Sequence, residues 1–166
     1  MKISKVTNVG QQDLDKTFDI IQNNMQKLDW TVNENDKMLW QDSFKNMLMK
    51  QNFSVYFVFK KDELCAFFEL EQLGNELILH EIQLNDNVKH TFVLLNILQF
   101  LLSNKDFEKY KTIKFSILKN NDMSNKTFTH LGGEKVKETE NKFYYLLTRE
   151  KAEKFLTKFE RYQIKN

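Results

Sequence analysis

The sequence has no proline, one cysteine and only four glycines among its 166 residues. Because Cys65 has no second cysteine to pair with, an intrachain disulfide is excluded, which is typical of a reducing compartment and predicts a cytoplasmic location. Without proline, the breaks between helices and strands must come from Gly, Asn and Asp. Neither an internal repeat nor a low-complexity linker interrupts the chain.

Strong charge of one sign and long hydrophobic runs are also missing. The formal charge is +2, from 25 basic and 23 acidic residues, which is too balanced for an electrostatic nucleic-acid binder. The N-terminal stretch lacks the apolar core of a signal peptide, and no apolar run approaches membrane-spanning length. The sequence therefore predicts neither a nucleic-acid nor a membrane partner.

Metal ligands are sparse as well. The three histidines, His80, His90 and His130, have no metal-ligand spacing, and Cys65 alone cannot complete a zinc site. We therefore expect no metal, and we interpret Cys65 as a small core residue.

What the sequence does contain is enough for a core: 41% of the residues are hydrophobic, including 15 Phe. We expect one domain over residues 1–166, in which 149–166 form a helical extension. Apolar spacing of three and four predicts amphipathic helices, whereas spacing of two predicts strands. The predicted helices cover residues 13–28, 36–50, 88–103 and 150–162, and the predicted strands cover residues 2–7, 53–60, 64–71, 76–84, 112–118 and 142–148. Residues 61–63 and Gly74-Asn75 are expected to form hairpin turns.

This order of elements predicts an α/β (α+β) fold. Three hairpin-linked strands are followed by a helix and a parallel return, so the sheet should be mixed and should carry helices on both faces. A further short helix is expected in the segment Asn121-x-x-Ser124-x-x-x-Phe128-x-x-Leu131-Gly132-Gly133, between the strands at 112–118 and 142–148.

That segment resembles the C-terminal half of the GNAT superfamily of N-acetyltransferases, and the resemblance covers most of residues 2–149. It implies a GNAT-like, mostly antiparallel central sheet with an extra C-terminal helix. It also implies acetyl-CoA, or another acyl-CoA, as co-substrate. In the family, an Asn at the position of Asn121 and a small residue at that of Ser124 bind this cofactor. Replacing Asn121 with Ala is therefore expected to weaken coenzyme A binding with little loss of stability.

The resemblance assigns further cofactor contacts to the strand at 76–84 and to the loop after it, whose amides cradle the pyrophosphate. The matching positions are Ile82, Leu84, Asn87, Val88, Lys89, His90 and Thr91. The family's glycines are missing from this loop, and Asp86 adds a negative charge that Lys89 and His90 would offset. A simple helix cap at residues 85–87 is the competing interpretation.

Two positions bear on the chemistry. Phe128 stands where the family often has the Tyr that protonates the departing thiolate, and phenylalanine cannot donate a proton. Glu81 is the candidate base, because it lies in an apolar run that would raise its pKa. Strict alternation places Glu81 on the face of Leu77 and Leu79, and His80 on the opposite face.

Four more residues are weaker candidates. Glu69 and Glu71 are available to bind a cationic amine, and Trp30 and Trp40 either line an acceptor pocket or pack in the core.

The predicted function is acyl-CoA-dependent N-acyltransfer, in which acetyl passes from acetyl-CoA to the amine of a small molecule or peptide. The alternative is a non-catalytic module that keeps the GNAT fold for binding or interaction. An acyl-chain binder lined by Phe is a third interpretation. The apolar stripe of the helix at 150–162 would dock on its own domain or on a second subunit, which leaves a homodimer open.

Overall fold

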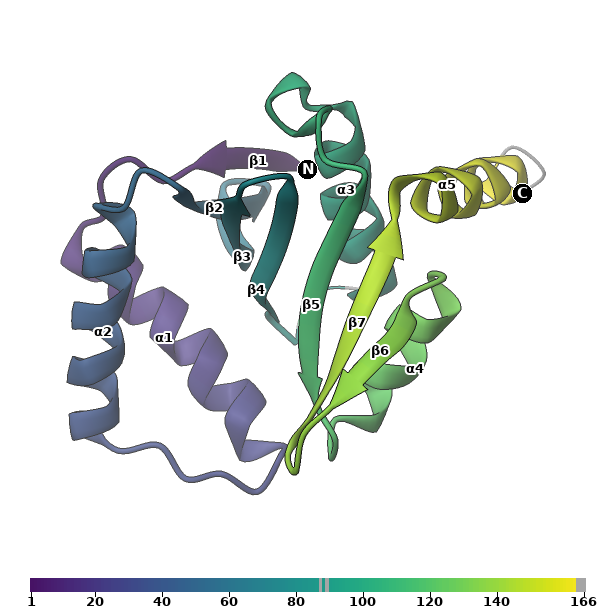
Figure 1. Ribbon diagram of the computed structural model, residues 1–166. Helices are drawn as coiled ribbons and strands as arrows, with labels where there is room; N and C mark the ends of the chain where they lie inside the picture. The colour runs from purple at the N-terminus through teal and green to yellow at the C-terminus, as the bar shows by residue number, and fades with distance from the viewer. Residues whose placement is uncertain (87, 89, 164–166) are drawn as a thin grey trace. The chain divides into compact units, whose positions relative to one another are not determined.

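The computed structural model describes residues 1–86, 88 and 90–163, without the side chains at 90, 91 and 159–163 (Figure 1). The helices are α1 (Gln11–Gln26), α2 (Glu34–Leu48), α3 (His90–Ser103), the 3-10 turn η1 (Lys105–Phe107), α4 (Asp122–His130) and α5 (Arg149–Gln163). The strands are β1 (Lys2–Lys5), β2 (Phe53–Lys60), β3 (Glu63–Leu73), β4 (Glu76–Leu84), β5 (Thr112–Leu118), β6 (Glu134–Glu138) and β7 (Lys142–Thr148).

The strands form one seven-stranded sheet in the order β1-β2-β3-β4-β5-β7-β6. β4 and β5 are parallel, whereas the pairs β1–β2, β2–β3, β5–β7 and β6–β7 are antiparallel. The mixed, mostly antiparallel sheet and the C-terminal helix that the sequence predicted are confirmed. Backbone contacts divide the chain into two compact units. Unit 1 comprises Met1–Glu71 and His80–Val93, and unit 2 comprises Gln72–Leu79 and Leu94–Asn166.

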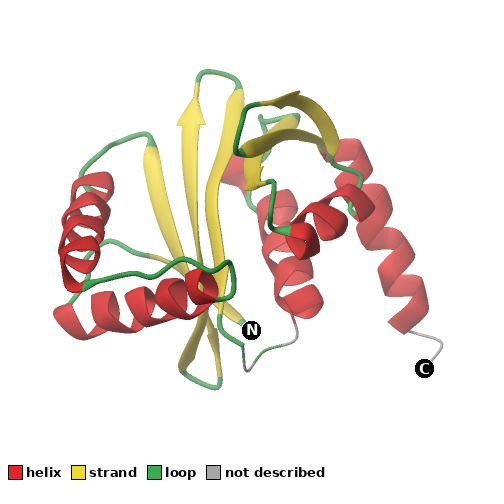
Figure 2. Cartoon of the chain, turned by 90° about the horizontal axis from the view of Figure 1, so that it is seen from below, coloured by secondary structure: helices red, strands yellow, loops and turns green. Residues whose placement is uncertain are grey.

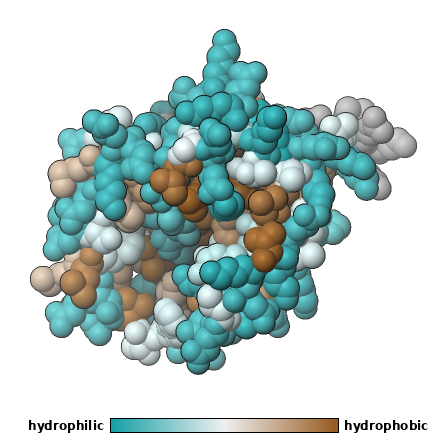
Figure 3. Space-filling model, in the orientation of Figure 1, coloured by the Kyte–Doolittle hydropathy of each residue, from teal (hydrophilic) through white to brown (hydrophobic). Residues whose placement is uncertain are grey.

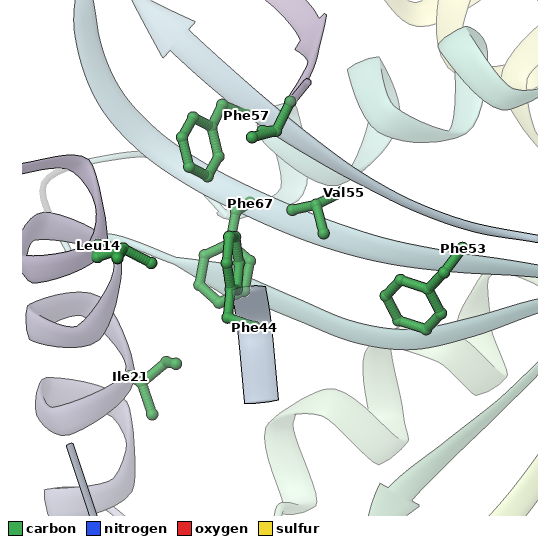
Figure 4. Packing of buried hydrophobic residues seen from close by; sticks show 8 residues of the cluster. Leu14, Ile21, Phe44, Phe53, Val55, Phe57 and Phe67 are labelled. Atoms are coloured by element: carbon green, nitrogen blue, oxygen red, sulfur yellow. The ribbon is translucent and has the colours of Figure 1, made fainter. Parts of the chain in front are cut away.

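Unit 1 is organised around β2 and β3, with α1 and α2 lying side by side (Figure 2). All six residues at 53–58 are buried, so both faces of β2 are covered. Phe44 of α2 has no exposed surface, and its ring lies 6.4 Å from those of both Phe57 and Phe67 (Figure 4). A capping box begins α2: the Asn33 side chain accepts from the Asp36 amide, and the Asp36 carboxylate accepts from the Asn33 amide.

The turns of unit 1 follow the sequence closely. The predicted turn at residues 61–63 is shorter, because Lys61 and Asp62 both have positive φ and Glu63 already pairs with Lys60. Two central residues with positive φ give the twist that a tight hairpin needs. The helix predicted from residue 88 begins at His90.

Unit 2 contains the pair β5–β7, in which all seven residues of each strand are in register. Ile113, Phe115 and Ile117 are buried on one face of β5, as their alternation predicted. Arg149 joins α5 to the preceding elements, since its guanidinium donates to the carbonyl oxygens of Leu102 and Phe107.

The first half of α5 docks on its own unit. Ala152 is fully buried, and the ring of Phe155 lies edge-on to His130 of α4, with 5.7 Å between the ring centres. The side chains of Phe159 and Tyr162, which continue the predicted apolar stripe, lie outside the described residues. Within the described part of the chain, no helix is both long and apolar enough to cross a membrane.

Candidate functional site

A buried carboxyl group lies in the sheet of unit 1. Glu69 of β3 is only 3% exposed and sits opposite Val55 of β2. Burial, followed by the charge of Glu81, raises the pKa of Glu69 to about 8. No donor among the described residues reaches Glu69 Oε1. Since a buried polar atom normally has a partner, this oxygen is an exception that calls for an explanation.

Glu81 is held by a chain of amide side chains. Gln83 Nε2 donates to Glu81 Oε1 over 2.7 Å, and Gln83 Oε1 accepts from Asn24 Nδ2 of α1 over 2.7 Å. Asn24 Nδ2 also lies 3.1 Å from the Leu84 carbonyl oxygen. Because one end of this chain is fixed to α1, the carboxylate of Glu81 is oriented by a helix of the same unit.

His80 and Glu71 form an acidic–basic contact in unit 1. His80 Nε2 lies 2.8 Å from Glu71 Oε2, and the His80 ring stacks on Phe53 at 5.4 Å. Phe53 belongs to the core that α1 and α2 cover, so His80 lies on that side of the sheet. Glu81 lies on the same side of the sheet, because its hydrogen-bond partner Gln83 also bonds to Asn24 of α1. The prediction that His80 and Glu81 point to opposite faces is therefore wrong, and the strand departs from regular alternation between them, as bulged strands do.

Two of the described amides in the loop after β4 already have acceptors within the protein. The Asn85 amide donates to the Cys65 carbonyl over 2.8 Å, and the Val88 amide lies 3.3 Å from the Asn85 carbonyl. Asp86, whose charge would oppose a phosphate, is paired with Lys27 at the end of α1. Val88 itself is buried.

Only some of the other predicted cofactor contacts in this region lie within the described residues. Asn87 and Lys89 lie outside the described residues, as do the side chains of His90 and Thr91. Ile82 and Leu84 are partly buried at the end of β4. The Asn85 amide points toward β3, so by alternation the backbone groups of Ile82 and Leu84 point away from that strand.

In unit 2, Asn121 is the N-cap of α4. Its side-chain oxygen accepts from the Ser124 amide over 3.1 Å and satisfies one of the free donors at the helix start. This cap predicts a loss of stability in Asn121→Ala, where the family resemblance alone predicted little loss. The cap uses the side-chain oxygen and not the side-chain amide nitrogen.

Aromatic rings fix the rest of α4. Phe128 lies 4.6 Å from Phe115 of β5, which stacks on Tyr145 of β7 at 5.3 Å. The buried Tyr145 hydroxyl donates to Asn125 Oδ1 over 2.8 Å. Asn125 Nδ2 in turn donates to the carbonyl oxygens of Leu118 and Asn121. This network ties the loop before α4 to β7.

The two tryptophans differ in how deeply they are buried. Trp40 packs in the core of unit 1, 5.0 Å from Phe44 and 5.8 Å from Phe18. Trp30 is 54% exposed, close in sequence to the exposed Met38 and Leu39. Over α1 and α2, at the left of Figure 3, hydrophobic areas are small and separated by hydrophilic side chains.

Cysteine and metal chemistry find little support in the described residues. Cys65 is 2% exposed and its Sγ lies 3.2 Å from the Val58 carbonyl oxygen; burial raises the pKa of its thiol, so the core interpretation is confirmed. Within the described part of the chain, no three His, Cys, Asp or Glu side chains come together as metal ligands.

From the sequence, Glu69 is a weaker candidate than Glu81, and the amide side chains that hold Glu81 are not predicted. A signal for Glu69 was available, because it follows the apolar run at residues 64–68 within a predicted strand. Asn24 and Gln83 are 59 positions apart, and no local pattern connects them.

Comparison of the sequence with protein-family models and with curated protein sequences gives no match. Solved structures, by contrast, match over nearly the whole chain. An acetyltransferase from Thermus thermophilus is 10% identical, with a TM-score of 0.71 over 89% of this chain and 97% of that one. A nucleotide-linked sugar GNAT, FdhC in its apo form, is 15% identical, with a TM-score of 0.69 over 96% of this chain and 92% of that one.

A third structure contains the cofactor. The N-acetyltransferase PseH of Campylobacter jejuni, in complex with acetyl coenzyme A, is 13% identical, with a TM-score of 0.62 over 89% of this chain and 97% of that one. These identities are low, so the likeness concerns the arrangement of the backbone. Together with the sheet order and the C-terminal helix, it shows that the chain has the fold of the GNAT superfamily of N-acetyltransferases.

Proposed function

We propose that this chain is an acyl-CoA-dependent N-acyltransferase that transfers acetyl from acetyl-CoA to an amine. The observation that carries the proposal is the GNAT fold, shared with acetyltransferases of which one holds acetyl coenzyme A. The carboxyl pair of Glu69 and Glu81 adds chemical support, because acyl transfer to an amine needs a group that accepts the proton of the ammonium.

Each proposed residue has a distinct task. Acetyl-CoA, when bound, supplies the acetyl group. Glu81, oriented by Gln83, is proposed to take the proton from the acceptor amine, while burial keeps Glu69 protonated near neutral pH. Phe128 cannot donate a proton to the leaving thiolate, so turnover relies on alignment and on backbone donors.

The residues fit the cofactor unevenly. The backbone of Ile82 and Leu84 and the Asn121 amide nitrogen are proposed to contact it, with Ser124 at the start of α4. The pyrophosphate has less to bind, because the amides of Asn85 and Val88 already have acceptors within the protein. For the remaining loop positions, Asn87, Lys89, His90 and Thr91, the assignment rests on the family resemblance.

The same two amides favour a second candidate function. A GNAT fold whose phosphate loop is closed on itself would serve as a non-catalytic binding module. The ion pair between Lys27 and Asp86 agrees with that alternative, since it anchors the loop to α1 rather than leaving a cation for phosphate.

Calorimetric titration of the purified chain with acetyl-CoA, desulfo-coenzyme A and ADP distinguishes the two functions. The acyltransferase predicts saturable micromolar binding of acetyl-CoA and of the desulfo compound, and weaker binding of ADP. A panel of primary amines, followed by release of free thiol, then tests transfer. A folded chain that binds none of the three compounds would overturn the enzyme proposal and leave the binding module.

A further inference from the structure

A chain of polar side chains runs from the end of α1 to Glu81 within unit 1. Lys27 Nζ lies 3.4 Å from Asn24 Oδ1, and Asn24 Nδ2 donates to Gln83 Oε1 over 2.7 Å. Gln83 Nε2 then donates to Glu81 Oε1 over 2.7 Å. At the outer end, Lys27 is also paired with Asp86 of the loop after β4.

The direction of this chain is set by a backbone carbonyl group. A carboxamide could point either its oxygen or its nitrogen along the chain, so one neighbour must decide between the two orientations. The Leu84 carbonyl oxygen can only accept, and it lies 3.1 Å from Asn24 Nδ2. A reversed Asn24 would bring two oxygens together there. Asn24 therefore directs its nitrogen toward Gln83, which in turn directs its own nitrogen toward Glu81.

The Leu84 carbonyl fixes this direction more firmly than the ion pair does. The side chains of Lys27 and Asp86 are 48% and 55% exposed, and exposed ion pairs contribute little to the order of a structure. The contact of Lys27 with Asn24, at 3.4 Å, is also long for a hydrogen bond. Asn24 itself is partly buried, and its nitrogen holds a side chain and the backbone of β4 at once. Asn24 is therefore the residue on which the chain depends.

We propose that Asn24 is a positioning residue for Glu81, which acts through Gln83 to hold the Glu81 carboxylate in the orientation that receives a proton. The inference rests on the proposed function, in which Glu81 is the base. A base works only while its oxygen is held where the proton leaves the substrate. A donor at a fixed position on one oxygen of the carboxylate provides that hold.

The first test is the side-chain amide signal of Gln83 in nitrogen-15 NMR spectra of the full chain, identified by its loss in Gln83→Leu. Asn24→Ala should move this signal, because Gln83 loses the donor that orients it. Asn24→Asp should move it further, since a carboxylate only accepts and would turn the Gln83 nitrogen away from Glu81. Asn23→Asp makes the same charge change at the neighbouring, exposed position of α1 and should leave the signal in place.

The second test is steady-state transfer of acetyl from acetyl-CoA to primary amines. Asn24→Ala should lower kcat by about ten-fold or more, with KM for acetyl-CoA changed by less than about two-fold, because the base is misoriented and not removed. The double variant Asn24→Ala with Gln83→Leu should be no slower than Gln83→Leu alone, since Asn24 acts only through Gln83. Circular dichroism checks that each variant folds, and Asn24→Ala carries both tests if Asn24→Asp does not.

The two tests separate this inference from the proposed function. A Gln83 signal that stays in place in the Asn24 variants overturns the positioning role, even if the chain transfers acetyl. An equal shift in Lys27→Met gives the orienting role to the ion pair and also overturns it, as does an unchanged kcat of Asn24→Ala in an active chain. A signal moved by the Asn24 variants alone, in a chain that transfers no acetyl, supports the orientation of Glu81 by Asn24 and counts against the acyltransferase.

Discussion

The carboxyl group of Glu69 on β3 is buried beside that of Glu81 on β4, and the charge of Glu81 adds to burial in raising the pKa of Glu69 to about 8. The two residues are 12 positions apart, and the turn at Gly74 and Asn75 brings their strands together as a hairpin. Such a buried carboxyl group makes the stability of unit 1 dependent on pH.

The first prediction concerns stability and pH. Between pH 4.5 and about 8, folded Glu69 keeps a proton that the unfolded chain has released. Unfolding therefore releases a proton, and the free energy of unfolding should fall as the pH rises through this window, by roughly 1 kcal/mol per pH unit at most. Above about pH 8 this decline should end, because both states are then ionised.

Urea unfolding at several pH values measures this slope. Glu69→Gln should flatten it, since glutamine has no proton to release, whereas Glu63→Gln at an exposed site should leave it unchanged. Equal slopes for the wild type and Glu69→Gln would show that Glu69 ionises normally in the fold.

The second prediction separates the two possible roles of Asn121. Asn121→Ala removes the acceptor for the Ser124 amide and should cost about 1 kcal/mol of stability. Asn121→Ser keeps a capping oxygen but lacks the amide nitrogen, so it should stay within about 0.5 kcal/mol of the wild type. If the amide nitrogen contacts the cofactor, both variants should bind acetyl-CoA more weakly in calorimetry. A serine variant with wild-type affinity would remove Asn121 from the site.

How far the sequence predicts this molecule depends on whether the signal is local. The strands at Phe53–Lys60, Glu76–Leu84, Thr112–Leu118 and Lys142–Thr148 were predicted to the residue, because alternation and turn residues are local properties. The cap formed by Asn121, three residues before Ser124, is local as well. It was not predicted, because the family resemblance assigned Asn121 to the cofactor.

The candidate site was harder to predict because its parts meet only in the fold. Glu69 is buried because β2 lies beside it, and Glu81 is oriented because Gln83 reaches Asn24 on α1. The irregular strand at His80 changes which side chains share a face, and strict alternation cannot anticipate it. The occupied Asn85 amide of the loop after β4 likewise depends on a carbonyl from β3.

The third prediction restores the missing acid. Phe128 is only partly buried, and its ring already packs on Phe115, so Phe128→Tyr should fold normally. If the chain transfers acetyl groups, the new hydroxyl should raise turnover by about ten-fold or more, because a positioned general acid typically contributes about 100-fold or more. Steady-state assays of thiol release measure the change. Phe143→Tyr, which adds a hydroxyl to another partly buried ring of unit 2, should give no gain, and equal rates for all three proteins would exclude an acid at position 128.

The last prediction tests the end of α4. A Cβ at Gly133 would lie 2.8 Å from the Phe128 carbonyl oxygen and 3.2 Å from Phe115 Cζ. The first of these atoms is backbone, and the Gly133 amide also donates to it over 2.9 Å, so the close approach cannot be relieved by turning a side chain. Gly133→Ala should therefore cost about 2 kcal/mol of stability in urea unfolding.

Gly10→Ala is the matched control, because a Cβ there meets no atom within 4 Å and the backbone is extended. It should cost less, roughly 0.5–1 kcal/mol, which is the difference between Gly and Ala at an N-cap. Equal stability of the two variants would mean that α4 and Phe128 shift readily to admit a side chain, and the packing of Phe128 on Phe115 would then not hold this helix in place.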